Sequence, residues 1–107
     1  DKFGDTALLV ENVAMGRDLA KAVGPGRTIL MRGHGATVAG FSVRHAVFVS
    51  IYLEVNAKLQ MQAEGMTRKI KFLTKGEVKK VTDTTTPQNV NRAWENWCRM
   101  VDRPFRD

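Results

Sequence analysis

The amino-acid sequence predicts an α/β chain, and three observations lead to that prediction. Two short apolar runs, 28–31 and 36–39, have the length and composition of strands and are separated by Gly33-His34-Gly35. A long apolar segment after Ser42 has the length of a helix. Further segments with helical spacing come before and after this unit. We therefore expect helices packed around a small sheet.

Capping residues and helix breakers mark the ends of the expected helices. The first helix is predicted over residues 8–23, where Gly24-Pro25-Gly26 stops it. The longest helix is expected to begin after the N-cap Ser42 and to run to about Ala63, before Gly65. Its apolar side chains cover more than one face, which predicts burial on more than one side.

Two shorter helices are predicted in the last third of the chain. Thr74 and Glu77 have the spacing of a capping box, and the helix that they open is expected to reach about Val81. Thr86 is predicted to cap the last helix, with Pro87 at its first position, where a missing N–H costs least. The apolar residues at helical spacing in this last helix are Val90, Ala93, Trp94, Trp97, Met100 and Val101.

The length and composition of the chain limit the classes of protein to which it can belong. The chain has 107 residues, enough for one small domain, and it begins at Asp1 without a methionine, as a fragment of a longer protein would. No apolar stretch approaches the ~18 residues that a membrane helix needs, and no signal peptide is recognisable, so we expect a cytoplasmic protein without a membrane partner. The single cysteine, Cys98, excludes an intrachain disulfide and is expected to pack. Residues 103–107 are expected to fray.

The chain is basic, with 17 Lys and Arg residues against 11 Asp and Glu residues and a net charge of +6. Its densest basic cluster is Arg68-Lys69-Ile70-Lys71, followed by Lys75, Lys79 and Lys80, and only Phe72 is aromatic nearby. Nucleic-acid-binding surfaces combine clustered basic residues with aromatic ones, so this spacing favours solvated helix ends and a loop. We expect no nucleic-acid partner. A small anionic substrate would use the same charge with fewer residues.

The segment Ile29-Leu-Met-Arg-Gly-His-Gly-Ala-Thr-Val-Ala-Gly40 carries the main functional signal. His34 lies between two glycines at the end of a predicted buried strand, where a metal ion or ligand is able to approach the imidazole. A catalytic divalent metal site typically needs three protein ligands, and the other histidine, His45, has no local ligand spacing. His34 is therefore either a structural residue of a tight turn or one ligand of a site whose other members lie elsewhere. Whether the two strands form a hairpin or lie end to end stays open.

The other candidate site residues give weaker signals. Glu54 interrupts the apolar surface of the long helix, and a carboxylate in such a place needs a partner. Arg32 and Arg44 are able to bind a carboxylate or phosphate through two hydrogen bonds, although surface arginines are common. The aromatic residues expected in a core or at a subunit interface, rather than in substrate stacking, are Tyr52, Trp94 and Trp97.

Four segments of the sequence resemble those of a known family. They are Phe3-Gly-Asp-Thr-Ala-Leu-Leu-Val10, the segment 29–40 quoted above, Ala46-Val-Phe-Val-Ser-Ile-Tyr-Leu-Glu-Val-Asn-Ala57 and Arg92-Ala-Trp-Glu-Asn-Trp97. Together they resemble the C-terminal half of the class II aldolase/adducin superfamily. The first and last segments are most similar to bacterial decarboxylases that act on hydroxylated aromatic or ring-cleavage carboxylates.

The resemblance implies a fold and a metal site. The fold is a three-layer α/β/α domain, of which residues 1–107 are the C-terminal portion, in a homotetramer with active sites between subunits. In the family a divalent metal is held by a His-x-His pair and by one later histidine before a glycine, and His34 matches that later position. The pair and the acidic catalytic residue are expected upstream, so this fragment alone should be inactive. Zinc is the expected metal, with manganese, magnesium or cobalt as alternatives.

The activity implied by the resemblance is that of a metal-dependent carbon–carbon lyase. It would be a decarboxylase or an aldolase that acts on a small hydroxy- or oxo-carboxylate or on a sugar phosphate, through an enolate that the metal stabilises. Glu54 and Arg32 are expected to support the metal ligands or to contact the substrate. The alternative is a non-catalytic, adducin-like assembly module. His34 favours the enzyme, because a module without metal has no need of that residue.

Overall fold

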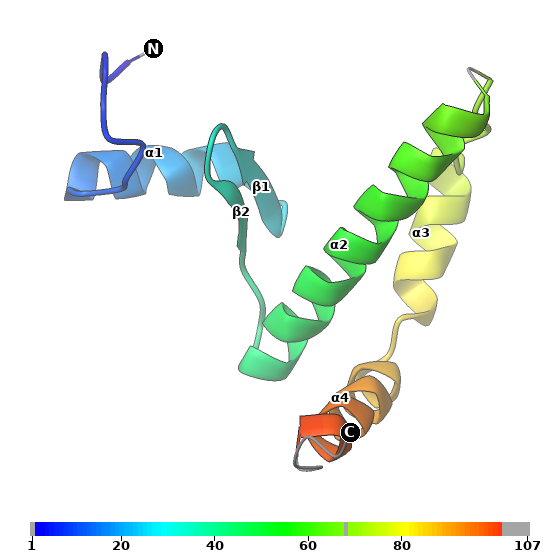
Figure 1. Cartoon of the computed structure of the whole chain (residues 1–107). Helices are drawn as coiled ribbons and strands as arrows, with labels where there is room; N and C mark the ends of the chain where they lie inside the picture. The colour runs from blue at the N-terminus through cyan, green and yellow to red at the C-terminus, as the bar shows by residue number, and fades with distance from the viewer. Residues whose placement is uncertain (1, 68, 102–107) are drawn as a thin grey trace, which may run out of the picture. The chain divides into compact units, whose positions relative to one another are not determined.

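Within residues 2–67 and 69–101, which the computed structural model describes, the chain forms four helices and two strands (Figure 1). The elements are α1 (Val13–Val23), β1 (Thr28–Met31), β2 (Gly35–Val38), α2 (Val43–Met66), α3 (Lys75–Thr84) and α4 (Pro87–Val101). They belong to two compact units, Asp1–Gly40 and Phe41–Asp107. The first unit holds α1 and both strands, and the second holds the other three helices.

The two strands of the first unit form an antiparallel hairpin, in which Met31 of β1 pairs with Gly35 of β2. The carbonyl of Met31 accepts the backbone N–H of His34 at 3.1 Å, which closes a tight turn between the strands. Gly33 has a φ of 71° at the third position of this turn, where a type II β-turn requires a positive φ. The glycine beside His34 therefore lets the chain reverse, and of the two arrangements that the sequence left open the hairpin is observed.

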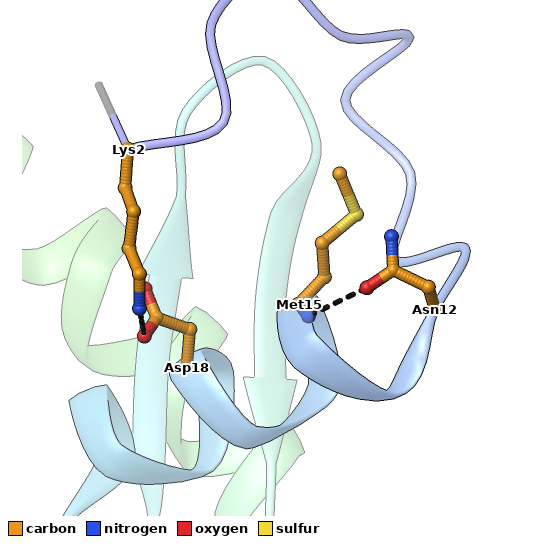
Figure 2. Close-up of polar contacts among 4 residues, drawn as sticks. All are labelled: Lys2, Asn12, Met15 and Asp18. Carbon is orange, nitrogen blue, oxygen red and sulfur yellow. Dashed lines mark hydrogen bonds and ion pairs between the residues drawn. The ribbon is translucent and has the colours of Figure 1, made fainter.

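Helix α1 begins later than the sequence predicts. The expected helix covers residues 8–23, whereas the observed one starts at Val13. Asn12 is its N-cap, with a side-chain oxygen that accepts the N–H of Met15 at 2.9 Å (Figure 2). This bond satisfies one of the N–H groups that have no partner within a helix. Leu8 has a φ of 63°, outside the right-handed helical region, so the apolar run before Asn12 belongs to a loop.

The two glycines that were expected to end helices behave differently. Gly24 follows α1 with a φ of 54° and donates its N–H to the carbonyl of Ala20, so the predicted stop is confirmed. Gly65 instead lies inside α2, which ends at Met66 with Thr67 as its C-cap. A glycine ends a helix when it takes a left-handed conformation, and Gly65 does not. The predicted end of α2 is therefore too early.

The predicted caps of α2 and α3 are confirmed. The hydroxyl oxygen of Ser42 accepts the N–H of His45 at 3.2 Å at the start of α2. At the start of α3 the N–H of Thr74 donates to Glu77 Oε2 at 2.7 Å, and the N–H of Glu77 donates back to Thr74 Oγ1 at 3.2 Å. These two bonds make the complete capping box. The helix continues further than predicted, to Thr84.

Helix α4 begins at Pro87, as the sequence predicts, but the polar contacts before it differ from the expected cap. The backbone N–H and the hydroxyl of Thr86 both donate to Asn89 Oδ1. The backbone carbonyl of Thr86 accepts the N–H of Asn89 at 3.0 Å. Asn89 therefore binds back to the residue before the helix, and the Thr86 hydroxyl acts as a donor rather than as the capping acceptor.

The second unit is joined by contacts between α2 and α4. The ring centroids of Phe48 and Trp97 lie 6.1 Å apart. Arg44 places its guanidinium carbon 5.8 Å from the ring centroid of Trp94 and donates from Nη1 to Asn91 Oδ1 at 3.3 Å. Both tryptophans are half-buried where α4 contacts α2, and their expected place in a core or at a subunit interface stays a prediction.

Most apolar surface in the part of the chain that the structure describes stays open. No side chain there is buried, and Leu30 on β1 is 75% exposed. The expected burial of residues 28–31 and of α2 on several sides is therefore not found in this chain. Among the described helices and strands, α1 is the one element besides β2 that contacts β1, and α4 is the one that packs on α2. Cys98 is half-buried, in keeping with its predicted packing.

The observed architecture is mixed and rich in helices. Its sheet, in the described ranges, has two strands, so the three-layer arrangement stays a prediction. None of the helices within residues 2–67 and 69–101 combines the length and apolar character that crossing a membrane would require. The predicted fraying of 103–107 concerns residues outside the described part of the chain.

Candidate functional site

His34 lies at the tip of the hairpin, and its side chain is exposed. Its backbone is held by the hydrogen bond from its N–H to the carbonyl of Met31. The side chain of Met31 is held in turn, because the hydroxyl of Thr37 on the opposite strand donates to Met31 Sδ at 3.1 Å. The sequence thus places an accessible imidazole on a turn whose two strands are tied together.

A loop of residues 2–12 lies beside this turn and is attached to α1 at both ends (Figure 2). The Lys2 ammonium pairs with the Asp18 carboxylate on α1, and Asn12 caps the same helix. Leu8, in the middle of the loop, reaches the turn: a β-carbon built on Gly33 would lie 2.9 Å from Leu8 Cδ1. The loop therefore connects α1 with the residue next to His34.

The loop, α1 and the first strand line a pocket of about 400 Å³. Arg32, the residue two places before His34, contributes to its wall. No hydrogen bond or ion pair engages the Arg32 guanidinium within residues 2–67 and 69–101. Its planar fork is thus available to a carboxylate or phosphate. The apolar residues of the lining are Phe3, Leu8, Leu9, Val10, Met15, Leu19, Ala22 and Met31.

The chemistry of the donors decides whether this chain can hold a metal ion by itself. The imidazole of His34 is a suitable ligand, but three His, Cys, Asp or Glu side chains do not gather anywhere in the described ranges. His45 belongs to the second unit, where its ring stacks on that of Phe41 at 5.2 Å and its Nδ1 accepts the Phe41 N–H at 3.4 Å. The described residues therefore offer one candidate ligand, His34, and do not by themselves form a metal site.

Glu54 has the partner that the sequence predicts. Its Oε1 lies 2.6 Å from Nζ of Lys58, one helical turn further along α2. The hydrogen bond from Lys58, and then the positive charge of the same group, hold the pKa of the Glu54 carboxyl below its usual value. The side chain is 66% exposed, so the pair lies on the surface of the second unit. A role for Glu54 in the site stays a prediction.

Sequence reasoning missed Leu8 as a neighbour of the turn. The nearest local signal is Thr6, whose hydroxyl oxygen accepts the N–H of Leu8 at 3.1 Å and bends the loop. Threonine two residues before an apolar residue is too common to identify such a turn in advance. The contact between Leu8 and Gly33 joins residues far apart in the sequence, and only the folded chain shows it.

Comparison with known proteins adds the family. Residues 2–61 match the family described as Class II Aldolase and Adducin N-terminal domain, and this stretch includes Arg32, His34 and Glu54. The chain is 31% identical over 113 residues to the decarboxylase tropJ of Talaromyces stipitatus, covering 89% of this chain and 42% of that protein. It is 29% identical over 89 residues to a 3,4-dihydroxyphthalate decarboxylase of Arthrobacter keyseri, covering 83% of this chain and 36% of that protein.

The chain thus spans less than half the length of each of these two relatives. No solved structure matches it significantly. The family match covers more than half of the 107 residues and includes the glycine-flanked histidine together with most of α2. The chain belongs to the class II aldolase and adducin family.

Proposed function

We propose that this chain is part of a divalent-metal-dependent carbon–carbon lyase, a decarboxylase that acts on a small hydroxy- or oxo-carboxylate. The alignment with two proteins named decarboxylases, over 89% and 83% of the chain, is the main support for this proposal. The exposed imidazole of His34 on its hairpin turn supports the assignment of one metal ligand to this chain.

The chemistry of decarboxylation defines what the site must supply. The bond between the carboxylate carbon and its neighbour breaks, CO2 leaves, and the electron pair stays on the substrate as an enolate that then takes up a proton. A divalent ion, when bound, would supply positive charge that stabilises this enolate. Within this chain we assign Arg32 to the anionic group of the substrate, because it lines a pocket of mixed apolar and polar character in the first unit, together with Asp5 and the ion-paired Lys2 and Asp18.

The remaining parts of the proposal rest on the family resemblance. They are a zinc ion as the metal, with manganese, magnesium or cobalt as alternatives, a homotetramer, and a cytoplasmic location. The further metal ligands, a His-x-His pair, and the acidic catalytic residue would lie upstream of these residues. Glu54 would support the site or the packing of α2 through its contact with Lys58.

The test uses the complete gene-encoded protein. CO2 release is measured with 3,4-dihydroxyphthalate and with a series of hydroxylated aromatic carboxylates. We expect release from at least one member of the series, loss of release after treatment with a chelator, and recovery when a divalent metal is added back. Release that continues unchanged after complete removal of metal would contradict the metal-dependent mechanism. A protein that holds metal but acts on none of these compounds would contradict the substrate class.

The alternative is a non-catalytic, adducin-like assembly module, and the exposed apolar surface of α2 favours it. Several large side chains of this helix stay open to solvent, including Val43, Leu59, Met61 and Met66. The gene-encoded sequence separates the two functions. A His-x-His pair upstream of residue 1 supports the enzyme, and its absence, together with a protein that purifies without metal, supports the assembly module.

A further inference from the structure

We infer that the second unit binds a small aromatic carboxylate in a pocket bordered by α2, α4 and the end of α3. Arg92 holds the carboxylate, and the ring of Tyr52 contacts the ring of the ligand. The inference goes beyond the proposed function, because this pocket lies within residues 41–107 and binding there needs neither a metal ion nor turnover.

The pocket has the size of a small-molecule site. Its volume is about 770 Å³, and sites for small ligands typically occupy about 300–1,000 Å³. Phe48 and Tyr52 line it from α2, Val81 lines it from α3, and residues of α4 form most of the remaining wall. Among the described elements α3 packs on neither α2 nor α4, and Val81 stays 54% exposed. The three helices thus border a space that is large enough for a ligand.

Three aromatic residues form one part of the wall. The ring centroids of Phe48 and Tyr52 lie 4.6 Å apart, and those of Phe48 and Trp97 lie 6.1 Å apart. Phe48 and Trp97 are half-buried, whereas Tyr52 is 46% exposed. In the described ranges no hydrogen bond engages the Tyr52 hydroxyl. Tyr52 therefore offers a ligand both a ring surface and a polar group, a use that differs from the core or interface place expected from the sequence.

A row of polar residues on α4 forms another part of the wall. Its members, spaced three or four positions apart and so on one face of the helix, are Asn89, Arg92, Asn96 and Arg99. Arg99 Nη2 lies 3.8 Å from Glu95 Oε2, so the charge of Arg99 is compensated. The Arg92 guanidinium makes no hydrogen bond, ion pair or ring contact with the residues that the structure describes. Among the described residues of the wall, the uncompensated positive charge is therefore that of Arg92.

The aromatic residues and the free guanidinium together define the class of ligand. A guanidinium presents two parallel N–H donors that match the two oxygens of a carboxylate. A ring on the ligand extends the aromatic cluster, because rings attract one another in offset or tilted arrangements. An uncharged polypeptide segment fits this wall less well, since it would bury the Arg92 guanidinium without a counter-charge, at a large cost in free energy. A ring that carries a carboxylate satisfies both parts of the wall.

The test measures the binding of 4-hydroxybenzoate to the complete gene-encoded protein by isothermal titration calorimetry. Metal is first removed with a chelator, so that a carboxylate held by a metal ion does not contribute. We expect 4-hydroxybenzoate to bind. The uncharged 4-hydroxybenzamide should bind about tenfold more weakly or worse, because it lacks the charge that pairs with the guanidinium. Cyclohexanecarboxylate, which lacks the aromatic ring, should bind about two- to tenfold more weakly.

Variants locate the ligand within the protein. Arg92→Gln should weaken the binding of 4-hydroxybenzoate by about tenfold or more. Tyr52→Leu should weaken it by about two- to tenfold, and Tyr52→Phe should bind better than Tyr52→Leu because it keeps the ring. Arg17→Gln on α1 is the matched control, since Arg17 is exposed and does not line the pocket, while the change of charge is the same. Arg17→Gln should bind like the unmodified protein. The thermal unfolding midpoint of each variant is measured alongside its affinity.

Three results would overturn the inference. Absence of binding to the unmodified protein would mean that other polypeptide, from the same chain or a second copy, covers the pocket. Equal affinity of Arg92→Gln and Arg17→Gln would mean that Arg92 does not hold the carboxylate. Binding that falls in His34→Ala but not in Arg92→Gln would place the ligand at the turn of the first unit and leave the proposed function standing. A failure of the CO2-release test, in turn, leaves the binding predicted here unaffected.

Discussion

Phe48 on α2 and Trp97 on α4 face each other with ring centroids 6.1 Å apart and ring planes tilted by 49°. A tilted aromatic pair contributes about 0.5–1.5 kcal/mol beyond the area that it buries. We therefore predict a coupling energy of about that size in a double-mutant cycle of Phe48→Leu and Trp97→Leu, measured by chemical unfolding of the complete protein. A control cycle that pairs Phe48→Leu with Met100→Ala, a residue 65% exposed on α4, should give a coupling near zero. Strictly additive effects of the aromatic pair would refute the contact.

The capping box of α3 gives a second prediction. Thr74→Ala removes the hydroxyl oxygen that accepts the Glu77 N–H, and loss of such a cap costs about 1 kcal/mol. Hydrogen exchange of the α3 amides should therefore become several-fold faster. Thr82→Ala is the control, because the Thr82 hydroxyl donates to the Val78 carbonyl within the helix and caps nothing. Equal exchange rates in the two variants would show that the box does not hold the start of α3.

The same capping box predicts a dependence on pH. Hydrogen bonds from the backbone N–H and then the side chain of Thr74 hold the pKa of Glu77 below its usual value. The unfolded value lies near 4.3, so this stabilisation is complete above that pH and is lost as the pH falls through the lower folded pKa. The α3 amides should lose protection in that acidic range. In Glu77→Gln the loss should be absent, and an unchanged acid profile in that variant would contradict the assignment.

We expect Glu54 to affect turnover through its ion pair with Lys58. The lowered pKa of Glu54 means that the ion pair stabilises the folded chain above about pH 4.3 and ceases to do so as the pH falls through the folded pKa. Exposed pairs one turn apart contribute little to stability, so Glu54→Gln should shift the unfolding midpoint no more than Glu64→Gln on the same helix. We expect Glu54→Gln, and not Glu64→Gln, to lower turnover. If turnover in Glu54→Gln equalled that of Glu64→Gln, the role of Glu54 in the site would be refuted.

Local signals in the sequence predicted the start of three helices and the turn, but not the contacts of Thr86 or the Asn12 cap of α1. Ser42, the pair Thr74 and Glu77, and Pro87 mark helix starts that the structure confirms, because the bonds of a cap join residues within one turn. The predicted start of α1 was wrong, because the apolar residues before Asn12 have helical spacing. The positive φ of Leu8, which shows that this segment is not helical, does not follow from its being a leucine. Gly65 was wrongly predicted to end α2, because glycine favours the end of a helix when it takes a left-handed conformation and Gly65 does not take one.

The candidate site was predictable only in part. The glycines around His34 predicted a turn and an accessible imidazole, and both are found. The close approach of Leu8 to Gly33 was not predictable, because it depends on a loop that folds back onto a turn far away in the sequence. The expected burial of α2 was not found, since burial depends on what packs against an apolar face and not on the face alone.

The most direct test of the central claim is the metal content of the complete protein with His34→Ala. Equal amounts of the purified protein, His34→Ala and the control His45→Ala are analysed for zinc, manganese, cobalt and magnesium after dialysis. Because one ligand of the site would be lost, we predict that His34→Ala retains only a small fraction of the metal. His45→Ala should retain nearly all of it, since His45 contacts Phe41 within its own unit. Metal content in His34→Ala equal to that of the unmodified protein would contradict the account.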